Sequence, residues 1–264
     1  KIPYVWHIRQ FMEADLGKKL FREKYVYRLV ARASSVIAIS KDVQAKFEPL
    51  LGRKVDLVYN GVPVEKYKLE DVIRFESQAT RMLLAGRISV QKGQMDAIKA
   101  VELLMRRGIG NVSLTLVGQG ESKEYLEYVK SYVKEHKLEQ KICILEHHDD
   151  LRELRRQCDI GLTCSKKEAF GRVTVENMLA KMLVIGANTG GTLEIVEDGY
   201  NGLLYEEGNP ESLVNQIEYT MSHRDKAQQM IEQGFIQVIE DFSIKRVVDQ
   251  VLNLYKLIDS RITI

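Results

Sequence analysis

Short apolar runs alternate with longer amphipathic stretches from residue 81 onward. Runs such as RMLLAG, VSLTLVG and IGLTC are mostly apolar, which is typical of strands that are buried on both faces of a sheet. The stretches between them, such as QMDAIKAVELLMRRG, carry apolar residues three and four positions apart and predict helices with one buried face. This alternation with short connections predicts an α/β protein whose parallel sheet is covered by helices on both faces.

The same pattern gives the expected elements of this region. A further helix is expected to start at Asn209, because asparagine is a good N-cap and Pro210 suits the first turn. A helical tail should run from about residue 224 to 259, with a break near residues 241–243. We expect strands at residues 81–86, 112–118, 141–145, 160–164 and 183–187, and helices at residues 94–108, 121–138, 150–157, 173–181 and 192–196.

The first 65 residues show only the end of a similar unit. We expect strands at residues 2–8, 34–40 and 54–61, and a helix at residues 41–51 that is capped by Ser40. Such a unit is too short to be a complete α/β domain, and the chain opens on lysine rather than methionine. We therefore expect a chain that is truncated at its N-terminus.

Composition favours a folded cytoplasmic protein. The chain is 45% hydrophobic and 29% charged with only four prolines, which argues against disorder, and its apolar runs are too short to span a bilayer. Cys143, Cys158 and Cys164 form no CxxC pair and lie in or beside apolar segments. Reduced, buried thiols explain them best, and a disulfide or metal role is the less favoured alternative.

Positive charge is concentrated near the N-terminus. Residues 1–75 carry 15 Lys and Arg against 9 Asp and Glu, whereas the remainder carries 24 against 28. The excess is greatest in KKLFREKYVYRLVAR, residues 18–32. A solvated helix face is the favoured explanation, and a surface facing anionic lipid or a lipid-linked substrate is the alternative.

Ligand sites of open parallel sheets lie beyond the carboxyl ends of the strands, and four loops of this kind carry candidate chemistry. In the first, AGRISVQKG, Gly86 and Gly93 flank Arg87 and Lys92. Two cations on a loop that precedes a helix suit a phosphate or diphosphate, although surface loops often carry such residues.

The second loop is LVGQGES, residues 116–122, in which Gly118 and Gly120 allow a close approach of the backbone, as a nucleotide requires. Lys123 stands where a third glycine would complete GxGxxG. A nicotinamide-binding fingerprint is therefore not supported.

The third loop holds two glutamates separated by seven residues. Glu168 is expected in the loop, the backbone N–H groups of residues 169–172 (Ala169 to Arg172) should point at a bound anion, and Glu176 lies one turn into the helix. Helical side chains lean toward the N-terminus, so the Glu176 carboxylate can reach the same edge. Carboxylates accept hydrogen bonds from pairs of sugar hydroxyls, so the combination suggests a sugar nucleotide, whereas two solvent-facing charges remain the simpler alternative.

The fourth loop is NTGGTLEIV, where Gly190 and Gly191 precede a helix and Glu194 lies in its first turn. A plain glycine-rich turn with a capping acid would explain it equally simply. The EHHDD run at residues 146–150 could suggest a metal site, but Asp149 and Asp150 fit better as the cap and first turn of a helix. We expect no metal and no other cofactor.

Taken in order, these motifs resemble a known family. GRISVQKG, VGQG, SKKEAFGRVTVENM and GGTLEIVEDGYNGLLY resemble the C-terminal half of the retaining glycosyltransferases of family 4, which have the GT-B fold. IPYVWHI and ASSVIAIS with VDLVYNGV resemble the last strands of that family's N-terminal domain. The resemblance covers nearly the whole chain, and the ordered set of motifs is much more specific than any one of them.

The resemblance implies a division of the chain into three regions. Residues 1–68 would be the last portion of an incomplete N-terminal, acceptor-side α/β domain, and residues 69–236 a Rossmann-like domain that binds the nucleotide sugar. Residues 237–264 would form a C-terminal helix that packs back toward the N-terminal part. The first half of the acceptor-side domain would be absent, and with it the glycine-rich acceptor loop.

The resemblance also implies roles for the candidate residues. Glu168 and Glu176 match the family's E-x7-E motif, in which the first glutamate contacts the donor sugar and the second contacts the nucleotide ribose. Arg87 and Lys92 match the basic pair that holds the donor diphosphate.

Further contacts with the donor follow from the same resemblance. Backbone amides around Phe170 and Gly171 would contact the sugar or phosphate, and His7 would reach the donor sugar across the cleft. Glu194 matches the acid of the family's GG..E loop.

The leading function is transfer of a sugar, with retention of configuration, from a nucleotide sugar to a saccharide or lipid-linked acceptor. A nucleotide-sugar epimerase or glycan phosphorylase of the same fold is one alternative, and a non-catalytic donor-binding or partner subunit is another. The expected partners are the nucleotide sugar and the acceptor, with peripheral contact of residues 18–32 at the inner face of the membrane as a further possibility and no nucleic acid.

Overall fold

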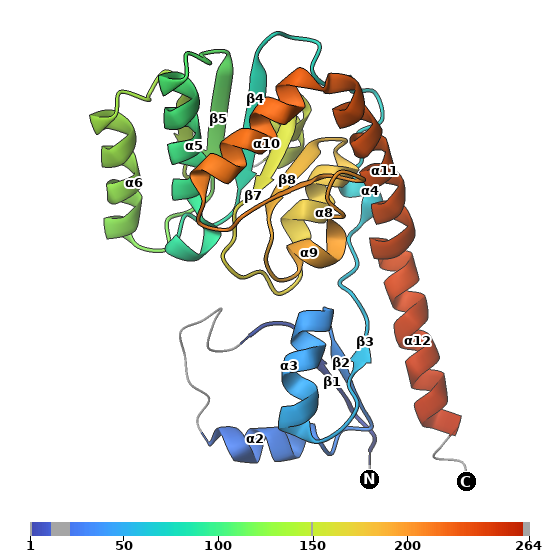
Figure 1. The fold of residues 1–264 in the computed structure, drawn as a ribbon. Helices are drawn as coiled ribbons and strands as arrows, with labels where there is room; N and C mark the ends of the chain where they lie inside the picture. The colour runs from blue at the N-terminus through green and yellow to red at the C-terminus, as the bar shows by residue number, and fades with distance from the viewer. Residues whose placement is uncertain (1, 12–21, 149, 261–264) are drawn as a thin grey trace.

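The computed structural model describes residues 2–11, 22–148 and 150–260. Within these residues the chain forms a three-stranded and a six-stranded parallel sheet, which belong to a smaller and a larger α/β unit (Figure 1). The predicted α/β class with parallel sheets is therefore confirmed. No helix in the described part of the chain is both long and apolar enough to cross a membrane.

The larger sheet has the strand order β6-β5-β4-β7-β8-β9, and all neighbouring strands are parallel. The chain adds β5 and β6 on one side of β4 and then crosses over to add β7 on the other side, so the point where the order reverses lies between β4 and β7. In such sheets this is the place where ligands bind. The strands are β4 (Thr80–Ala85), β5 (Val112–Val117), β6 (Ile142–Leu145), β7 (Ile160–Thr163), β8 (Leu183–Ala187) and β9 (Leu203–Tyr205).

Helices cover both faces of this sheet. The apolar positions predicted from the 3.6-residue period are buried: Ile98 and Leu104 of α5 are fully covered and pack in one cluster with Leu114 and Ile160 of the strands. Each such side chain contributes about 1.5–3 kcal/mol by leaving water. The helices are α5 (Gln94–Arg106), α6 (Lys123–Glu135), α7 (Leu151–Gln157), α8 (Arg172–Leu179), α9 (Thr192–Ile195) and α10 (Pro210–Ser222).

The segment that leads into the larger sheet is fixed by Arg74, which the sequence pattern does not single out. Its buried guanidinium donates to the carbonyl oxygens of Lys181 (2.8 Å), Ala180 (2.6 Å) and Arg156 (2.8 Å), and also to that of Cys158. Burial lowers the pKa of Arg74 to about 10, which leaves it charged at neutral pH. The backbone carbonyls thus replace the water that this cation loses.

The smaller unit contains β1 (Val5–Ile8), β2 (Ser35–Ala38) and β3 (Asp56–Leu57) in that order, with α2 (Glu23–Val30), α3 (Lys41–Leu51) and α4 (Val64–Tyr67). The predicted cap of α3 is confirmed, because the Ser40 hydroxyl accepts a hydrogen bond from the Val43 N–H at 3.1 Å.

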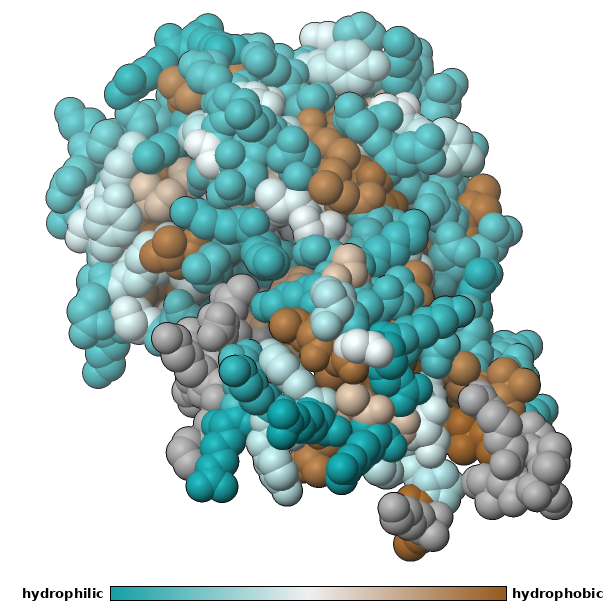
Figure 2. Space-filling view, turned by 60° about the horizontal axis from the view of Figure 1, so that its bottom comes forward, coloured by the Kyte–Doolittle hydropathy of each residue, from teal (hydrophilic) through white to brown (hydrophobic). Residues whose placement is uncertain are grey.

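The basic stretch 18–32 lies partly outside the described residues, which begin again at residue 22. Its described part includes α2, on which Lys24, Arg28 and Tyr25 are exposed. Figure 2 shows a mainly hydrophilic surface with separate hydrophobic patches. Contact with a membrane through this stretch stays a prediction.

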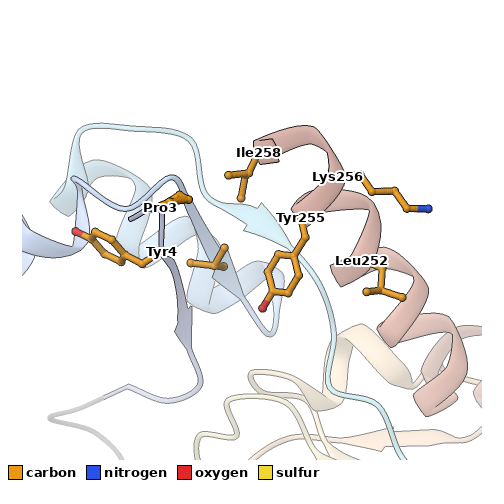
Figure 3. A pocket seen from close by; sticks show the side chains of 7 residues that line it. Pro3, Tyr4, Leu252, Tyr255, Lys256 and Ile258 are labelled. Atoms are coloured by element: carbon orange, nitrogen blue, oxygen red, sulfur yellow. The ribbon is translucent and has the colours of Figure 1, made fainter. Parts of the chain in front are cut away.

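Two long helices complete the chain, α11 (Arg224–Phe242) and α12 (Ile244–Ser260), and the expected break lies at Ser243. The boundary predicted after residue 236 falls inside α11. α12 runs beside the smaller unit in Figure 1. Between them lies a cavity of about 510 Å³ with Leu252, Tyr255 and Ile258 of α12 on one side and Pro3 and Tyr4 on the other (Figure 3).

Candidate functional site

Loops from both units line a cavity of about 230 Å³. Arg9 and Gln10, which follow β1, contribute from the smaller unit. The larger unit contributes the loops after β4, β5 and β7, which agrees with the expected position beyond the carboxyl ends of parallel strands. The lining residues of the larger unit are Arg87, Ser89, Gln91, Lys92, Glu121, Lys167, Glu168 and Ala169.

The loop after β4 is held in one conformation. Gly93 has a φ of +66°, and a Cβ there would lie 2.0 Å from the Cys164 carbonyl oxygen, so only glycine fits. Gln94 is fully buried, donates to the Arg87 carbonyl oxygen at 2.8 Å, and accepts from the Ser89 N–H at 3.2 Å. These contacts fix the backbone on both sides of Lys92.

Lys92 and Glu168 are brought together from loops that lie far apart in the sequence. The Lys92 Nζ lies 2.5 Å from Glu168 Oε2, and the Ser165 hydroxyl donates to the same oxygen at 3.1 Å. The side chains are 30% and 20% exposed, so both can still meet a ligand. The structure therefore joins the predicted phosphate-binding cation and the predicted sugar-binding carboxylate in one pair.

Arg87 lies on the same cavity and pairs with Glu121 at 3.2 Å, with both side chains about half exposed. The loops after β4 and β5 touch: a Cβ on Gly118 would lie 2.1 Å from the Gly86 carbonyl oxygen. Ile88 and Gly120 form an isolated bridge between the same loops. The predicted glycines thus allow two loops to meet beside the cavity, and their contact with a nucleotide stays a prediction.

The start of α8 lies beside this pair. Gly171 is its N-cap with a φ of +89°, and Ala169 lines the cavity. The Phe170 ring is buried, with its centroid 6.1 Å from that of Tyr59 and 5.5 Å from that of Phe242. Phe170, Gly171 and Arg172 do not line this cavity. Their predicted contact with the donor, through backbone N–H groups, stays a prediction.

Glu176 does not line this cavity. Its carboxylate is buried, with one oxygen 2.6 Å from Nη2 of Arg155 and the other 2.8 Å from Nε of Arg172. The prediction that Glu176 reaches the same edge rests on helix geometry alone, and that geometry says nothing about its neighbours. Arg155, which sequence reasoning missed, is 1% exposed and supplies the strongest of these contacts.

Glu194 also turns away from the cavity. One carboxylate oxygen accepts from the Lys41 N–H at 2.8 Å and the Tyr59 hydroxyl at 3.0 Å, and the other accepts from the Asp42 N–H at 3.0 Å. These partners belong to the smaller unit. Its predicted contact with the donor is untested and stays a prediction.

His7 lies in an adjoining cavity of about 620 Å³, whose lining shares Arg9 and Gln10 with the first. The pKa of His7 is lowered because partial desolvation of its ring, and then the positive charge of Arg9, disfavour the imidazolium. His7 is therefore neutral at pH 7, when its ring can both donate and accept a hydrogen bond.

An NMR titration of the His7 ring protons checks this assignment. We expect a midpoint below the ordinary value of about 6.5, and Arg9→Gln should raise it only part of the way, because desolvation is the larger cause. The unfolded chain then takes up the proton first, so stability falls as pH decreases from about 6.5 toward the lowered pKa. In His7→Gln, the unfolding temperature should depend less on pH between about 6.5 and the lowered pKa of His7. A midpoint at or above 6.5 would contradict the assignment.

The side chains that line the cavity carry more positive than negative charge, and the sequence indicates only part of this excess. Besides Arg87 and Lys92 it contains Arg9 and Lys167, opposed by Glu121 and Glu168. Lys167 directly precedes Glu168 in the sequence, so its proximity could have been predicted. Arg9 could not, because its position depends on how the two units are placed.

Among the described residues, no three His, Cys, Asp or Glu side chains gather in a way that could hold a metal ion. Asp150, predicted for the first turn of this helix, is instead its N-cap and accepts from the N–H groups of Arg152 (2.9 Å) and Glu153 (3.2 Å). Asp149 lies outside the described residues. The expectation that no metal is required stays a prediction.

Comparison with known proteins gives consistent results. Residues 66–237 match the sequence model of a family described as glycosyl transferases group 1. An uncharacterized glycosyltransferase of Methanocaldococcus jannaschii is 27% identical over 226 residues, and the match covers 84% of this chain and 60% of that protein. The N-acetyl-alpha-D-glucosaminyl L-malate synthase of Bacillus anthracis is 24% identical over 235 residues, covering 86% of this chain and 60% of that protein.

A similar solved structure is that of Anabaena HepE in complex with UDP and glucose. It superposes with a TM-score of 0.83 at 25% identity, covering 96% of this chain and 71% of that chain. HepE has also been solved with UDP-glucose, with a TM-score of 0.82 and 25% identity over 98% of this chain and 72% of that one. The chain therefore spans about 60% of the length of the two curated relatives and somewhat more of HepE.

Proposed function

Because the chain belongs to the glycosyl transferases group 1 family, we propose that it carries the donor site of a glycosyltransferase that uses a nucleotide sugar. The observation that carries this proposal is the cavity in which the Lys92–Glu168 pair meets Arg87 and Arg9. Cations hold a diphosphate, and a carboxylate accepts hydrogen bonds from sugar hydroxyls. Both kinds of group line the same cavity.

A uridine nucleotide is the proposed donor. HepE, which shares the fold at 25% identity, has been solved with UDP and with UDP-glucose. The acceptor is proposed to be a saccharide or a lipid-linked saccharide, and the transferred sugar a hexose, as the resemblance to family 4 implies. Retention of configuration is proposed on the same ground.

The chemistry follows from charge. As the bond from sugar C1 to the diphosphate breaks, negative charge grows on the leaving group and positive charge on the sugar ring. Arg87 and Lys92 would stabilise the leaving diphosphate, and Glu168 would hold the sugar. His7, neutral at pH 7, would offer a hydrogen bond to the sugar from the smaller unit. A metal ion is not part of the proposal, because these side chains supply the positive charge.

Glu176 is proposed to bind the ribose through one carboxylate oxygen. The oxygen that faces Arg172 is the one that can become free, because the Arg172 side chain is 59% exposed, whereas Arg155 is 1% exposed. Arg172 could then turn toward the phosphates. Glu176 would stay oriented by Arg155 throughout.

Calorimetric titration of this chain tests the proposal. UDP is expected to bind, uridine much more weakly, and a metal chelator should not change the affinity for UDP. Absence of UDP and UDP-sugar binding would contradict a donor site. Where an acceptor is supplied, transfer of the sugar supports a transferase, whereas release of sugar phosphate or an epimer would indicate a phosphorylase or an epimerase.

Glu168→Gln provides a sharper check of the sugar contact. We expect wild type to bind UDP-glucose more tightly than UDP, and Glu168→Gln to reduce that difference by about 10- to 100-fold, since a hydrogen bond to a charged group contributes about 1.5–3 kcal/mol. Affinity for UDP itself should not fall, because a negative charge beside the phosphates is removed. Glu139→Gln, an exposed acid outside the cavity, is the matched control. An unchanged difference between the two ligands would exclude Glu168 as the sugar contact.

A further inference from the structure

Glu194 connects the two units by hydrogen bonds over a long separation in sequence. Its carboxylate accepts from the first two N–H groups of α3, those of Lys41 and Asp42, at 2.8 and 3.0 Å. The first N–H groups of a helix have no partner within the helix and carry partial positive charge, so a carboxylate is well suited to them. α3 already has its own cap in Ser40, which pairs with Val43 and leaves these two groups for Glu194.

Tyr59, two residues after β3, adds a third hydrogen bond to the same carboxylate. Its hydroxyl donates to Glu194 at 3.0 Å, and burial, followed by the charge of Glu194, raises the pKa of Tyr59. Its ring lies 6.1 Å from that of Phe170 and 5.3 Å from that of Phe242, centroid to centroid. Tyr59 therefore contacts Glu194 through its polar end and the loop after β7 through its apolar part.

The loop that leads to Glu194 lies directly on the loop that carries Glu168. Gly191 N–H donates to the Glu168 carbonyl oxygen at 2.7 Å, and the Thr189 hydroxyl donates to the Ser165 carbonyl oxygen at 2.8 Å. A Cβ on Gly191 would lie 2.4 Å from the Phe170 carbonyl oxygen, so the two backbones are in contact. The loop that leads to Glu194 is therefore hydrogen-bonded directly to the backbone of the loop that carries Glu168.

We propose that Glu194 is a positioning residue that holds the N-terminus of α3, and with it the smaller unit, against the loop that carries Glu168. The inference rests on the proposed function, because the cavity needs Arg9 of the smaller unit opposite Lys92 and Glu168 of the larger one. Glu194 does not face the cavity because both of its carboxylate oxygens accept hydrogen bonds from the smaller unit. Separation of the units would expose these groups and move Arg9 away from Lys92 and Glu168.

Two variants test this role. Glu194→Gln keeps the size of the side chain but presents an NH2 group to one of the two α3 amides, and Tyr59→Phe removes only the hydroxyl and keeps the ring. Glu197→Gln is the matched control, because Glu197 is an exposed acid of the same segment. Hydrogen exchange at Lys41 and Asp42 reports the contact itself, and calorimetric titration with UDP reports the cavity.

We expect Glu194→Gln to raise exchange at Lys41 and Asp42 at least 10-fold and to weaken UDP binding about 10-fold, with Tyr59→Phe showing a smaller change in the same direction. Glu197→Gln should leave both readouts unchanged. Unchanged exchange in Glu194→Gln and Tyr59→Phe, or faster exchange with unchanged UDP affinity in both, would overturn the proposal. If Glu194→Gln does not fold, Tyr59→Phe decides the outcome.

Failure of the proposed function has a different signature. A wild-type chain that binds no uridine nucleotide would contradict the donor site, yet exchange at Lys41 and Asp42 would still show whether Glu194 holds α3. Loss of UDP affinity on Glu194→Gln without faster exchange would instead mean that Glu194 contacts the donor, as the sequence resemblance implies, and would also overturn the positioning role.

Discussion

Replacing Lys92 by methionine is expected to weaken UDP binding by about 10- to 100-fold, because a charge-assisted hydrogen bond to phosphate contributes about 1.5–3 kcal/mol. If the chain transfers a sugar as proposed, the rate of transfer should fall by about 100- to 1,000-fold, since the developing charge on the leaving diphosphate loses a donor. Methionine retains most of the unbranched apolar stem of lysine and lacks its ammonium group. The effect therefore reports the charge and not the packing.

Binding of uridine shows whether Lys92→Met removes a phosphate contact or disturbs the whole site. Because uridine has no phosphate, its weaker binding should not change in Lys92→Met. Stability should change by less than about 1 kcal/mol, because the Lys92–Glu168 pair is partly exposed. Lys99→Met, at an exposed position on α5, removes the same charge outside the cavity and serves as the control. An equal loss of UDP affinity in both variants would mean that only net charge matters.

Replacing Arg155 by methionine is expected to destabilise the fold by about 3–5 kcal/mol, because Glu176 would keep a buried charge without its main partner. The Arg155 side chain is 1% exposed and that of Glu176 is 8% exposed, with 2.6 Å between Nη2 and the carboxylate oxygen. Arg155 also donates to the Asn177 side-chain oxygen at 3.1 Å. The loss should appear in urea unfolding as a lower midpoint with an unchanged slope.

A second substitution distinguishes an unpaired charge from a simple loss of packing. Arg155→Met combined with Glu176→Gln removes the isolated charge and should recover part of the lost stability. Arg156→Met is the control, since the Arg156 side chain is 45% exposed and its Nε lies 3.7 Å from Glu153 Oε2. If the double variant loses as much free energy of unfolding as the two single variants together, Arg155 acts through packing and the buried pair contributes little.

Much of the fold follows from local sequence. The alternation of apolar strands with amphipathic helices predicts the parallel sheet, and Ser40 and Asn209 predict the helix starts that they cap. The candidate loops are predictable for the same reason, because parallel strands place the segments that follow them at one edge. Lys92, Arg87 and Glu168 each follow a strand, and they meet in one cavity.

The partners of the remaining carboxylates could not be predicted from sequence. Glu176 and Glu194 occupy the expected positions on their helices, but one faces Arg155 and Arg172 and the other faces α3. Helix periodicity gives the direction of a side chain relative to its own helix. It does not say which charged group from a distant segment lies there.

The sequence by itself determined the fold class and the edge of the sheet at which the candidate basic and acidic loops lie. These depend on interactions between residues close in the chain and on the regular geometry of parallel strands. Only the tertiary structure decided that Arg9 completes the cavity, that Arg155 holds Glu176, and that Glu194 joins the two units. Each of these contacts depends on the relative placement of separate elements, which is set by the packing of the whole molecule.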